Sequence, residues 1–424
     1  MGNFNLLNLS TNYIDFAVEK ISSIDLNWMG KIIQWLIEGV GIIGLGIILF
    51  TLILKMIVLP LDIYSRYKMK KQSLMMKAMR PQMEKLQKQY ANDKQMYSLK
   101  VRELQKANGI SMVGACLPMI VSLVIFMVVF SAFSTYSQYA NLQSYKGMEE
   151  AYNASVEMYV LCEYESDEII HENGFLIKTT DKSLDAPAYF VDFDAFIKTA
   201  NAEQAEVDVE KFGKMTESEK MVVVRDYVRD GARRASADYY RKHDNGFLWV
   251  KNIWYPDSPL NKEVPSFANF SSAVSRASGT GMNASYEESY DEVTYYLRHE
   301  GYSDGKLEGN QVNGYFILIV LAIGLMFLQQ FISMRAQKDA NELSTVDGSG
   351  AKTNKWMLIL MPIIYGMFSF LYSAAFSTYM ITNTVFSLIT TVILNKIMDV
   401  KFAKKEANGE LFKNKKQTQR KRLK

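Results

Sequence analysis

Cysteine and histidine are scarce in this chain, with two cysteines and three histidines among 424 residues. Cys116 lies inside an apolar run and Cys162 in a hydrophilic segment, so we expect no structural disulfide. His171, His243 and His299 are too widely separated to form a metal-ligand set. A glycine-rich phosphate loop is also absent from the sequence. We therefore expect no catalytic residues, no metal and no cofactor, and a protein that is not an enzyme.

Long apolar runs are what the chain does contain. Hydrophobic residues make up 49% of it and charged residues 22%, as in a globular protein, but the apolar residues are gathered in blocks that can span a bilayer. The blocks are residues 39–61, 112–133, 314–334, 356–371 and 376–397. We therefore expect an all-α polytopic membrane bundle of five transmembrane helices.

The charges between the apolar blocks predict how the chain is oriented. Residues 64–110 contain twelve Lys or Arg against three acidic residues, and residues 401–424 contain ten against two. Basic segments stay in the cytoplasm, so both are expected there, with the N-terminus outside. Residues 141–312 hold eighteen basic and thirty-one acidic residues, and the alternation of spans places them outside.

This orientation divides the chain into nine expected parts. They are an external N-terminal segment (1–38), transmembrane helix 1 (39–62), a cytoplasmic helical hairpin (63–110), transmembrane helix 2 (111–140), an extracellular insertion (141–312), transmembrane helix 3 (313–334), a cytoplasmic loop (335–355), transmembrane helices 4 and 5 (356–397) and a basic cytoplasmic tail (398–424).

The N-terminal segment ends in an amphipathic pattern just before the first span. Trp28, Ile32, Trp35 and Leu36 share one helical face, which is typical of a helix lying in the outer membrane interface. The alternative is a simple N-terminal extension of the first span.

The hairpin is rich in methionine, a flexible side chain that adapts to varied apolar partners. Two explanations remain open: the methionines dock client segments, or they form the seam that packs the two hairpin helices together. The candidate docking residues are Met69, Met75, Met79, Met83 and Met96.

The extracellular insertion is expected to be α+β. Residues 155–163 and 175–179 are strand-like, whereas Thr216 to Tyr240 is helix-like and opens with Thr216 and Glu219 in the spacing of a capping box. Its length allows a small domain of its own.

Lys55 is a charged residue inside the first apolar block. A lysine at the centre of a membrane helix costs about 2.5–3.5 kcal/mol on insertion scales, so it needs a partner, a hydrated cavity or an escape route. The escape is snorkelling, because Leu61 lies only about 9 Å further along the helix. The alternative to snorkelling gives Lys55 a function: it is the central cation of a hydrophilic groove in the bundle.

Polar residues elsewhere on the spans are candidates to line such a groove. Interhelical hydrogen bonding explains each of them equally well, so only their combination with Lys55 favours a groove. The candidates are Thr51, Ser122, Gln329, Gln330, Thr378, Tyr379, Thr382 and Asn383.

The motifs of these segments resemble the YidC insertase family, with its Oxa and Alb relatives. The run from Thr51 to Leu61 is similar to that family's first core span, with Lys55 where an arginine is usual, a few residues before a Pro-Leu pair. The likeness continues in the basic hairpin and in the segments 114–118, 247–257, 361–366 and 379–387. Departures are Ser122 and Val124 in the second span, Ser373-Ala374-Ala375 between the last two, and the long outer insertion.

The resemblance implies a membrane protein insertase and foldase of a bacterial plasma membrane, acting on nascent membrane proteins alone or with the SecYEG translocon. Its basic tail is expected to bind ribosomal RNA or anionic lipid, and DNA is not expected as a partner. The tail residues are Lys413, Lys415, Lys416, Arg420, Lys421, Arg422 and Lys424. A small-solute channel or transporter and a membrane-anchored extracellular scaffold remain as alternatives.

Overall fold

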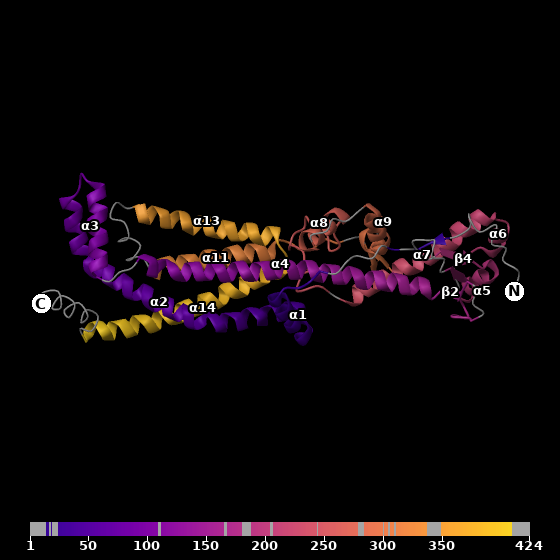
Figure 1. Ribbon diagram of the computed structural model, residues 1–424, viewed down its shortest axis with the longest axis horizontal. Helices are drawn as coiled ribbons and strands as arrows, with labels where there is room; N and C mark the ends of the chain where they lie inside the picture. The colour runs from indigo at the N-terminus through magenta and orange to yellow at the C-terminus, as the bar shows by residue number, and fades with distance from the viewer. Residues whose placement is uncertain are drawn as a thin grey trace. The chain divides into compact units, whose positions relative to one another are not determined.

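The computed structural model (Figure 1) contains two compact units. Unit 1 comprises residues 1–25, 138–245 and 260–312, and unit 2 comprises residues 26–137, 246–259 and 313–424. The residues that the structure describes are 14–16, 18, 24–108, 112–164, 168–179, 188–203, 207–243, 245–278, 284–299, 301–303, 306–308, 311–336 and 349–408. The tail residues Lys413 to Lys424 lie outside this set, as does most of the loop 335–355.

Unit 2 is built mainly of helices. They are α1 (Trp28–Val40), α2 (Ile43–Gln89), α3 (Lys94–Ala107), the first part of α4 (Met112–Glu157), α11 (Ile317–Ala336), α13 (Ser349–Leu371) and α14 (Ala374–Ala407). Within the described residues, three helices are long and apolar enough to cross a membrane: Ile43–Gln89, Ile317–Arg335 and Ala374–Ala407. The protein is therefore a helical membrane protein, and the number of five spans stays a prediction.

Helices α2 and α4 both run past the boundaries expected from the sequence. α2 continues from the first apolar block into the hairpin, with Pro60 and Pro81 inside it, because no glycine or turn sequence interrupts the residues between them. α4 likewise continues beyond residue 140 to Glu157. A change from apolar to polar residues alters what surrounds a helix without ending its backbone hydrogen bonds.

The junction between α1 and α2 is a sharp turn. Gly41 ends α1 with a φ of 75°, a left-handed conformation that glycine adopts without a steric penalty. α1 then packs against α2. Trp28, Ile32 and Trp35 are exposed, whereas Leu36 is buried, so the structure separates Leu36 from the other three residues of the expected face.

Aromatic rings hold α4, α13 and α14 together. Phe126, Phe130 and Phe133 of α4 contact Phe376 of α14, with ring centroids 5.2–6.5 Å apart. Phe130 also contacts Phe368 of α13 at 5.4 Å and Tyr372, just after α13, at 4.5 Å, and Phe133 contacts Tyr379 of α14 at 5.4 Å. α11, α13 and α14 pack against one another, and α14 packs along α2 (Figure 1).

Residues 246–259 form a segment, the capping segment, that lies at the N-terminal ends of two of these helices. The carbonyl oxygens of Ile253 and Tyr255 accept hydrogen bonds from the amides of Ala375 and Ala374 at the start of α14. Asn313 Nδ2 donates to the carbonyl oxygens of Asn252 and Pro256, at 2.9 and 3.0 Å. The structure therefore places this segment in unit 2, whereas the sequence assigned it to one continuous insertion, 141–312.

Asp257 is the fully buried carboxylate of the capping segment. Its Oδ1 accepts a hydrogen bond of 2.8 Å from the amide of Tyr315, and its Oδ2 accepts one of 2.6 Å from the amide of Leu318. Trp249 Nε1 donates to the same Oδ2 at 3.3 Å. A negative charge at a helix N-terminus also interacts favourably with the helix dipole, so Asp257 caps α11.

Unit 1 combines a small sheet with helices. The sheet has the order β1-β4-β3-β2, formed by Ile14–Asp15, Ala188–Val191, Leu176–Thr179 and Val160–Glu163. β3 pairs antiparallel with β4 and parallel with β2, and β5 (Gly301–Ser303) pairs antiparallel with β6 (Lys306–Glu308). Its helices are α5 (Phe193–Ala202), α6 (Val209–Gly213), α7 (Glu217–Lys242), α8 (Phe267–Ser278), α9 (Ala284–Val293), α10 (Tyr295–Arg298) and the end of α4.

Local sequence accounts well for helix α7. Its start carries the expected capping box, in which the amide of Glu219 donates to Thr216 Oγ and the amide of Thr216 donates to the Glu219 carboxylate. These hydrogen bonds from Thr216 hold the pKa of Glu219 below its usual value. Further along, Val224, Val228 and Ala232 face the core of unit 1 at helical spacing.

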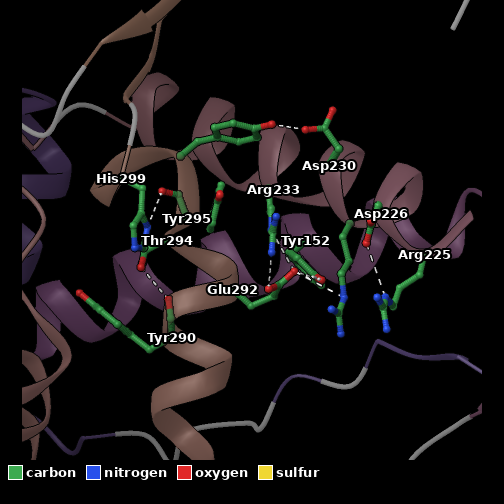
Figure 2. Close-up of polar contacts among 12 residues, drawn as sticks. Tyr152, Arg225, Asp226, Asp230, Arg233, Tyr290, Glu292, Thr294, Tyr295 and His299 are labelled. Carbon is green, nitrogen blue, oxygen red and sulfur yellow. Dashed lines mark hydrogen bonds and ion pairs between the residues drawn. The ribbon is translucent and has the colours of Figure 1, made fainter. Parts of the chain in front are cut away.

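A polar cluster joins three helices of unit 1 (Figure 2). Arg233 of α7 donates two hydrogen bonds to Glu292 of α9, at 3.0 and 2.8 Å, and Arg229 Nε lies 3.7 Å from the same carboxylate. Tyr152 of α4 donates a third hydrogen bond to Glu292 at 3.2 Å. Burial raises the pKa of Tyr152 above its usual value, and the nearby Glu292 charge acts in the same direction, so the phenol remains a donor.

Replacing Glu292 by glutamine is expected to destabilise unit 1 by about 1–3 kcal/mol. The estimate lies between values for exposed and fully buried pairs, because the Glu292 side chain is 21% exposed. Hydrogen exchange of α7 and α9 in the detergent-solubilised chain measures the effect. Glu288→Gln changes an exposed carboxylate of the same helix and should leave exchange unchanged; equal protection in both variants would contradict the prediction.

Candidate functional site

The first candidate residue, Lys55, lies where α2 meets α14. Its Nζ donates a hydrogen bond of 3.0 Å to Ser387 Oγ of α14. Lys55 is half-buried and Ser387 is buried, so the ammonium lies between two candidate spans and is bonded to protein. A hydroxyl group accepts this hydrogen bond without neutralising the charge, so the cation is solvated only in part by its partner.

A second cation lies on the same face of α2. Arg66 follows Lys55 by eleven residues, about three helical turns, and its Nη2 donates a hydrogen bond of 2.6 Å to Thr391 Oγ1. Asp62 lies between the two in the sequence and interacts electrostatically with both. We call these residues, Lys55, Asp62, Arg66, Ser387 and Thr391, the α2–α14 seam.

The seam continues toward the C-terminal ends of the two helices. Lys70 Nζ pairs with Asp399 at 2.5 Å, and Lys405 Nζ donates to the Tyr67 hydroxyl at 3.2 Å. The ring of Tyr67 stacks on Phe402, with centroids 5.1 Å apart. From Lys55 with Ser387, through Arg66 with Thr391, to Lys70 with Asp399, the partners advance along both helices, so the two helices run in the same direction.

The three threonine candidates bond to their own helices. Thr51, Thr378 and Thr382 each donate to the carbonyl oxygen four residues earlier, at 2.7–2.9 Å. This local bond satisfies the hydroxyl donor without a groove. Tyr379 is buried beside Phe133 and Phe376, within the aromatic packing.

Three of the remaining groove candidates are half-buried, and the side chain of the fourth is not among those that the structure describes. Gln329 and Gln330 of α11 and Asn383 of α14 are half-buried. Ser122 belongs to α4, but its side chain is outside the described set. Among the described residues, the contacts of Lys55 and Arg66 with α14 are therefore to Ser387 and Thr391, which the candidate list does not include.

The hairpin methionines divide into buried and accessible residues. Met79 and Met83 are 2% and 1% exposed and form a cluster with Met76 and Val101, against which Met75 also packs. Met69 is half-buried and Met96 is exposed. Met79 and Met83 thus pack between α2 and α3, and Met96 is the one exposed residue of the five candidates.

The spacing of charges in the sequence contains the signal that would have identified the rest of the seam. Asp62 and Arg66 stand seven and eleven residues after Lys55, so all three lie on one helical face. Ser387 and Thr391 are likewise four residues apart on α14. Within the described chain, no group of three or more His, Cys, Asp or Glu side chains is arranged to hold a metal ion.

The apolar helices and the polar seam between two of them define the class of this protein, a helical membrane protein with cations at an interhelical contact. The model of the family described as "60Kd inner membrane protein" matches residues 35–163 and 238–402, which is more than half of the chain. The chain belongs to this family.

Three relatives carry the name "Membrane protein insertase YidC". The protein of Fusobacterium nucleatum is 40% identical over 91 residues, which are 22% of this chain and 42% of the relative. That of Caldanaerobacter subterraneus is 31% identical over 113 residues, 27% of this chain and 53% of the relative. That of Geobacter metallireducens is 32% identical over 117 residues, 26% and 21% of the two chains. The chain thus spans about half or less of these relatives.

Proposed function

We propose that this protein is a non-enzymatic insertase and foldase, which places nascent hydrophobic segments in the plasma membrane of a bacterium. The observation that carries the proposal is the pair of cations Lys55 and Arg66, held by hydroxyl groups between two candidate spans. A cation there offers an interaction to acidic residues flanking an incoming hydrophobic segment. The names of the relatives support the same activity.

The proposed topology has five spans, with the N-terminus and unit 1 outside and the C-terminus in the cytoplasm. Its support is that α2, α11 and α14 all begin near the capping segment: Phe247 lies against Gly44 of α2, and the other two helices are capped by residues 253–257. If α2, α11 and α14 all cross the membrane in the same direction, the chain must cross back twice between them. α4 and α13 are the helices available for these two crossings. The basic hairpin and tail then both lie in the cytoplasm.

The proposed mechanism uses the hairpin first and the seam second. Met69 and Met96 on the hairpin contact the arriving apolar segment, and the groove beside Lys55 holds its polar flank. The segment then moves into lipid, because hydrocarbon solvates apolar side chains better than the polar seam does. Gln329, Gln330, Asn383 and Ser122 are the proposed further lining of the groove.

Complementation is the direct test of this function. Expression of the chain in bacterial cells depleted of their own insertase should restore growth and membrane insertion of reporter proteins. Reporters that need the SecYEG translocon and reporters that do not need it should be assayed in parallel, to establish whether the chain acts alone or with that translocon. Normal expression and membrane localisation without any rescue would contradict the proposed activity.

The basic tail is proposed to contact ribosomal RNA. If five or more of its seven basic residues from Lys413 to Lys424 contact phosphates, the logarithm of ribosome affinity should fall against the logarithm of salt with a slope of about −4 or steeper. Ribosome affinity is measured with a peptide of the tail, and a tail peptide with those residues changed to glutamine is the control. Binding to anionic vesicles without ribosome binding would assign the tail to lipid instead.

Unit 1 as an extracellular scaffold is the second candidate function, because it is a compact unit with its own core. The test must respect its segmented structure: residues 138–245 and 260–312 are replaced by short linkers, and the capping segment is kept. We expect insertase rescue to persist in this variant. Loss of rescue, with normal folding of the bundle, would assign an essential role to unit 1.

A further inference from the structure

A strained turn in the capping segment presents an apolar side chain to the surroundings. The amide of Phe247 donates to the carbonyl of Val250 at 2.9 Å, and the amide of Val250 donates back at 3.1 Å. Leu248 lies inside this turn with a φ of 59°, a conformation that glycine and asparagine adopt far more readily than leucine. Leu248 is nevertheless 69% exposed, so packing within the described structure does not explain a leucine there.

The residues on either side of Leu248 fix the position of this turn relative to the starts of α2 and α11. The ring of Phe247 lies against Gly44, so close that a Cβ on Gly44 would be 2.1 Å from its Cδ2. Trp249 donates to Asp257, which in turn caps the first turn of α11. The turn is thus attached to the beginnings of two candidate spans, at Ile43 and Ile317.

The surface next to those helix beginnings is apolar and exposed. Ile42 and Leu45 are exposed near the start of α2, and Ile317 and Val320 are exposed on the first turn of α11. Tyr315, immediately before α11, is exposed as well, and tyrosine is enriched at the level of lipid headgroups. Leu248 is thus one more exposed apolar side chain next to the helix starts to which its turn is attached.

We propose that the turn Phe247–Val250 is a membrane anchor, in which Leu248 inserts into the lipid at the end of the bundle where α2 and α11 begin. Apolar contact with acyl chains favours the leucine side chain, and this offsets the unfavourable backbone conformation. The anchor holds the capping segment, and with it the start of α11, at the bilayer interface. It does not depend on the insertase activity.

Site-specific fluorescence tests this anchor in the full chain. Cys116 and Cys162 are replaced by alanine, and a single cysteine carrying a polarity-sensitive dye is introduced at Leu248, Val320 or Met158. These positions are matched in exposure, at 69%, 67% and 68%, but Val320 lies on α11 and Met158 in unit 1. In phosphatidylethanolamine–phosphatidylglycerol vesicles, quenching is measured with nitroxide lipid labelled near the headgroup and with aqueous iodide.

We expect the Leu248→Cys dye to be quenched by the nitroxide lipid at least about half as strongly as the Val320→Cys dye, with little quenching by iodide. The Met158→Cys dye should show the opposite pattern. Iodide quenching at position 248 equal to that at 158 would overturn the anchor. Quenching by neither reagent would also overturn it, because protein would then cover the turn.

A second set of variants tests the leucine side chain itself, because the dye is no longer attached at position 248. The dye is placed at Lys251, an exposed position three residues along, and Leu248 is either retained or changed to glycine or methionine. Glycine suits the backbone, so the turn should fold, yet lipid quenching at 251 should fall by about half because the apolar side chain is lost. Methionine should preserve it. Equal quenching with glycine would contradict the proposal.

Discussion

Replacing Lys55 by alanine should strongly impair the insertion, in insertase-depleted cells, of client proteins whose translocated flank is acidic. In the proposed mechanism, the ammonium supplies a charge-assisted hydrogen bond to that flank, worth about 1.5–3 kcal/mol. Its loss corresponds to a roughly 10- to 100-fold slower or less complete insertion. The measurement is protease protection of reporter clients that differ only in one acidic residue of the flank.

The controls for this prediction separate charge from size. Lys55→Arg keeps a cation and should rescue, Lys55→Met keeps the length without the charge and should fail, and Ser387→Ala removes only the hydroxyl partner and should reduce rescue less. Clients with a neutral flank should be affected least by any of the three. Full insertion of acidic-flank clients by the Lys55→Met protein would contradict the role of the cation.

Replacing Asp257 by alanine should be the most destabilising single change in the capping segment. It leaves the amides of Tyr315 and Leu318 and the indole of Trp249 without their acceptor in a buried site. Each unsatisfied buried donor costs about 1–3 kcal/mol, so a total loss of roughly 3 kcal/mol or more is expected. Thermal unfolding of the purified chain in detergent, followed by exchange of the amides at the start of α11, measures it.

Asp93 offers a matched comparison for Asp257. It also caps a helix, accepting hydrogen bonds from the amides of Gln95 and Met96, but in an exposed position where water replaces the lost acceptor. Asp93→Ala should therefore cost only about 1 kcal/mol. Asp257→Asn keeps one acceptor oxygen and should lie between the two alanine variants. Equal effects of Asp93→Ala and Asp257→Ala would contradict the role assigned to burial.

Features that depend on neighbouring residues in the chain were predictable. Apolar length identifies the regions of α2, α11 and α14, and the pair Thr216 and Glu219 identifies the start of α7, because both depend on local spacing. Lys55 could be selected from its surroundings alone, since a charge in an apolar helix is costly wherever the helix packs.

The partners of these residues were not predictable in the same way. A hydroxyl on a membrane helix can donate to its own backbone or contact another helix, and sequence does not distinguish the two. Thr51 and Thr378 bond to their own helices, whereas Ser387 accepts from Lys55. The burial of Met79 and Met83 likewise depends on how α3 folds back on α2.

The sequence by itself thus determined the membrane class, the family resemblance and the presence of a charge, Lys55, inside an apolar helix, because hydrophobic length and charge are properties of a short stretch of chain. Only the tertiary structure decided that Arg66 joins Lys55 at α14, and that residues 246–259 belong to the bundle and divide unit 1 into separate segments. Those features arise from contacts such as Asp257 with Leu318, between residues about sixty positions apart. Such contacts exist only once the helices have packed and each buried polar group has found its partner.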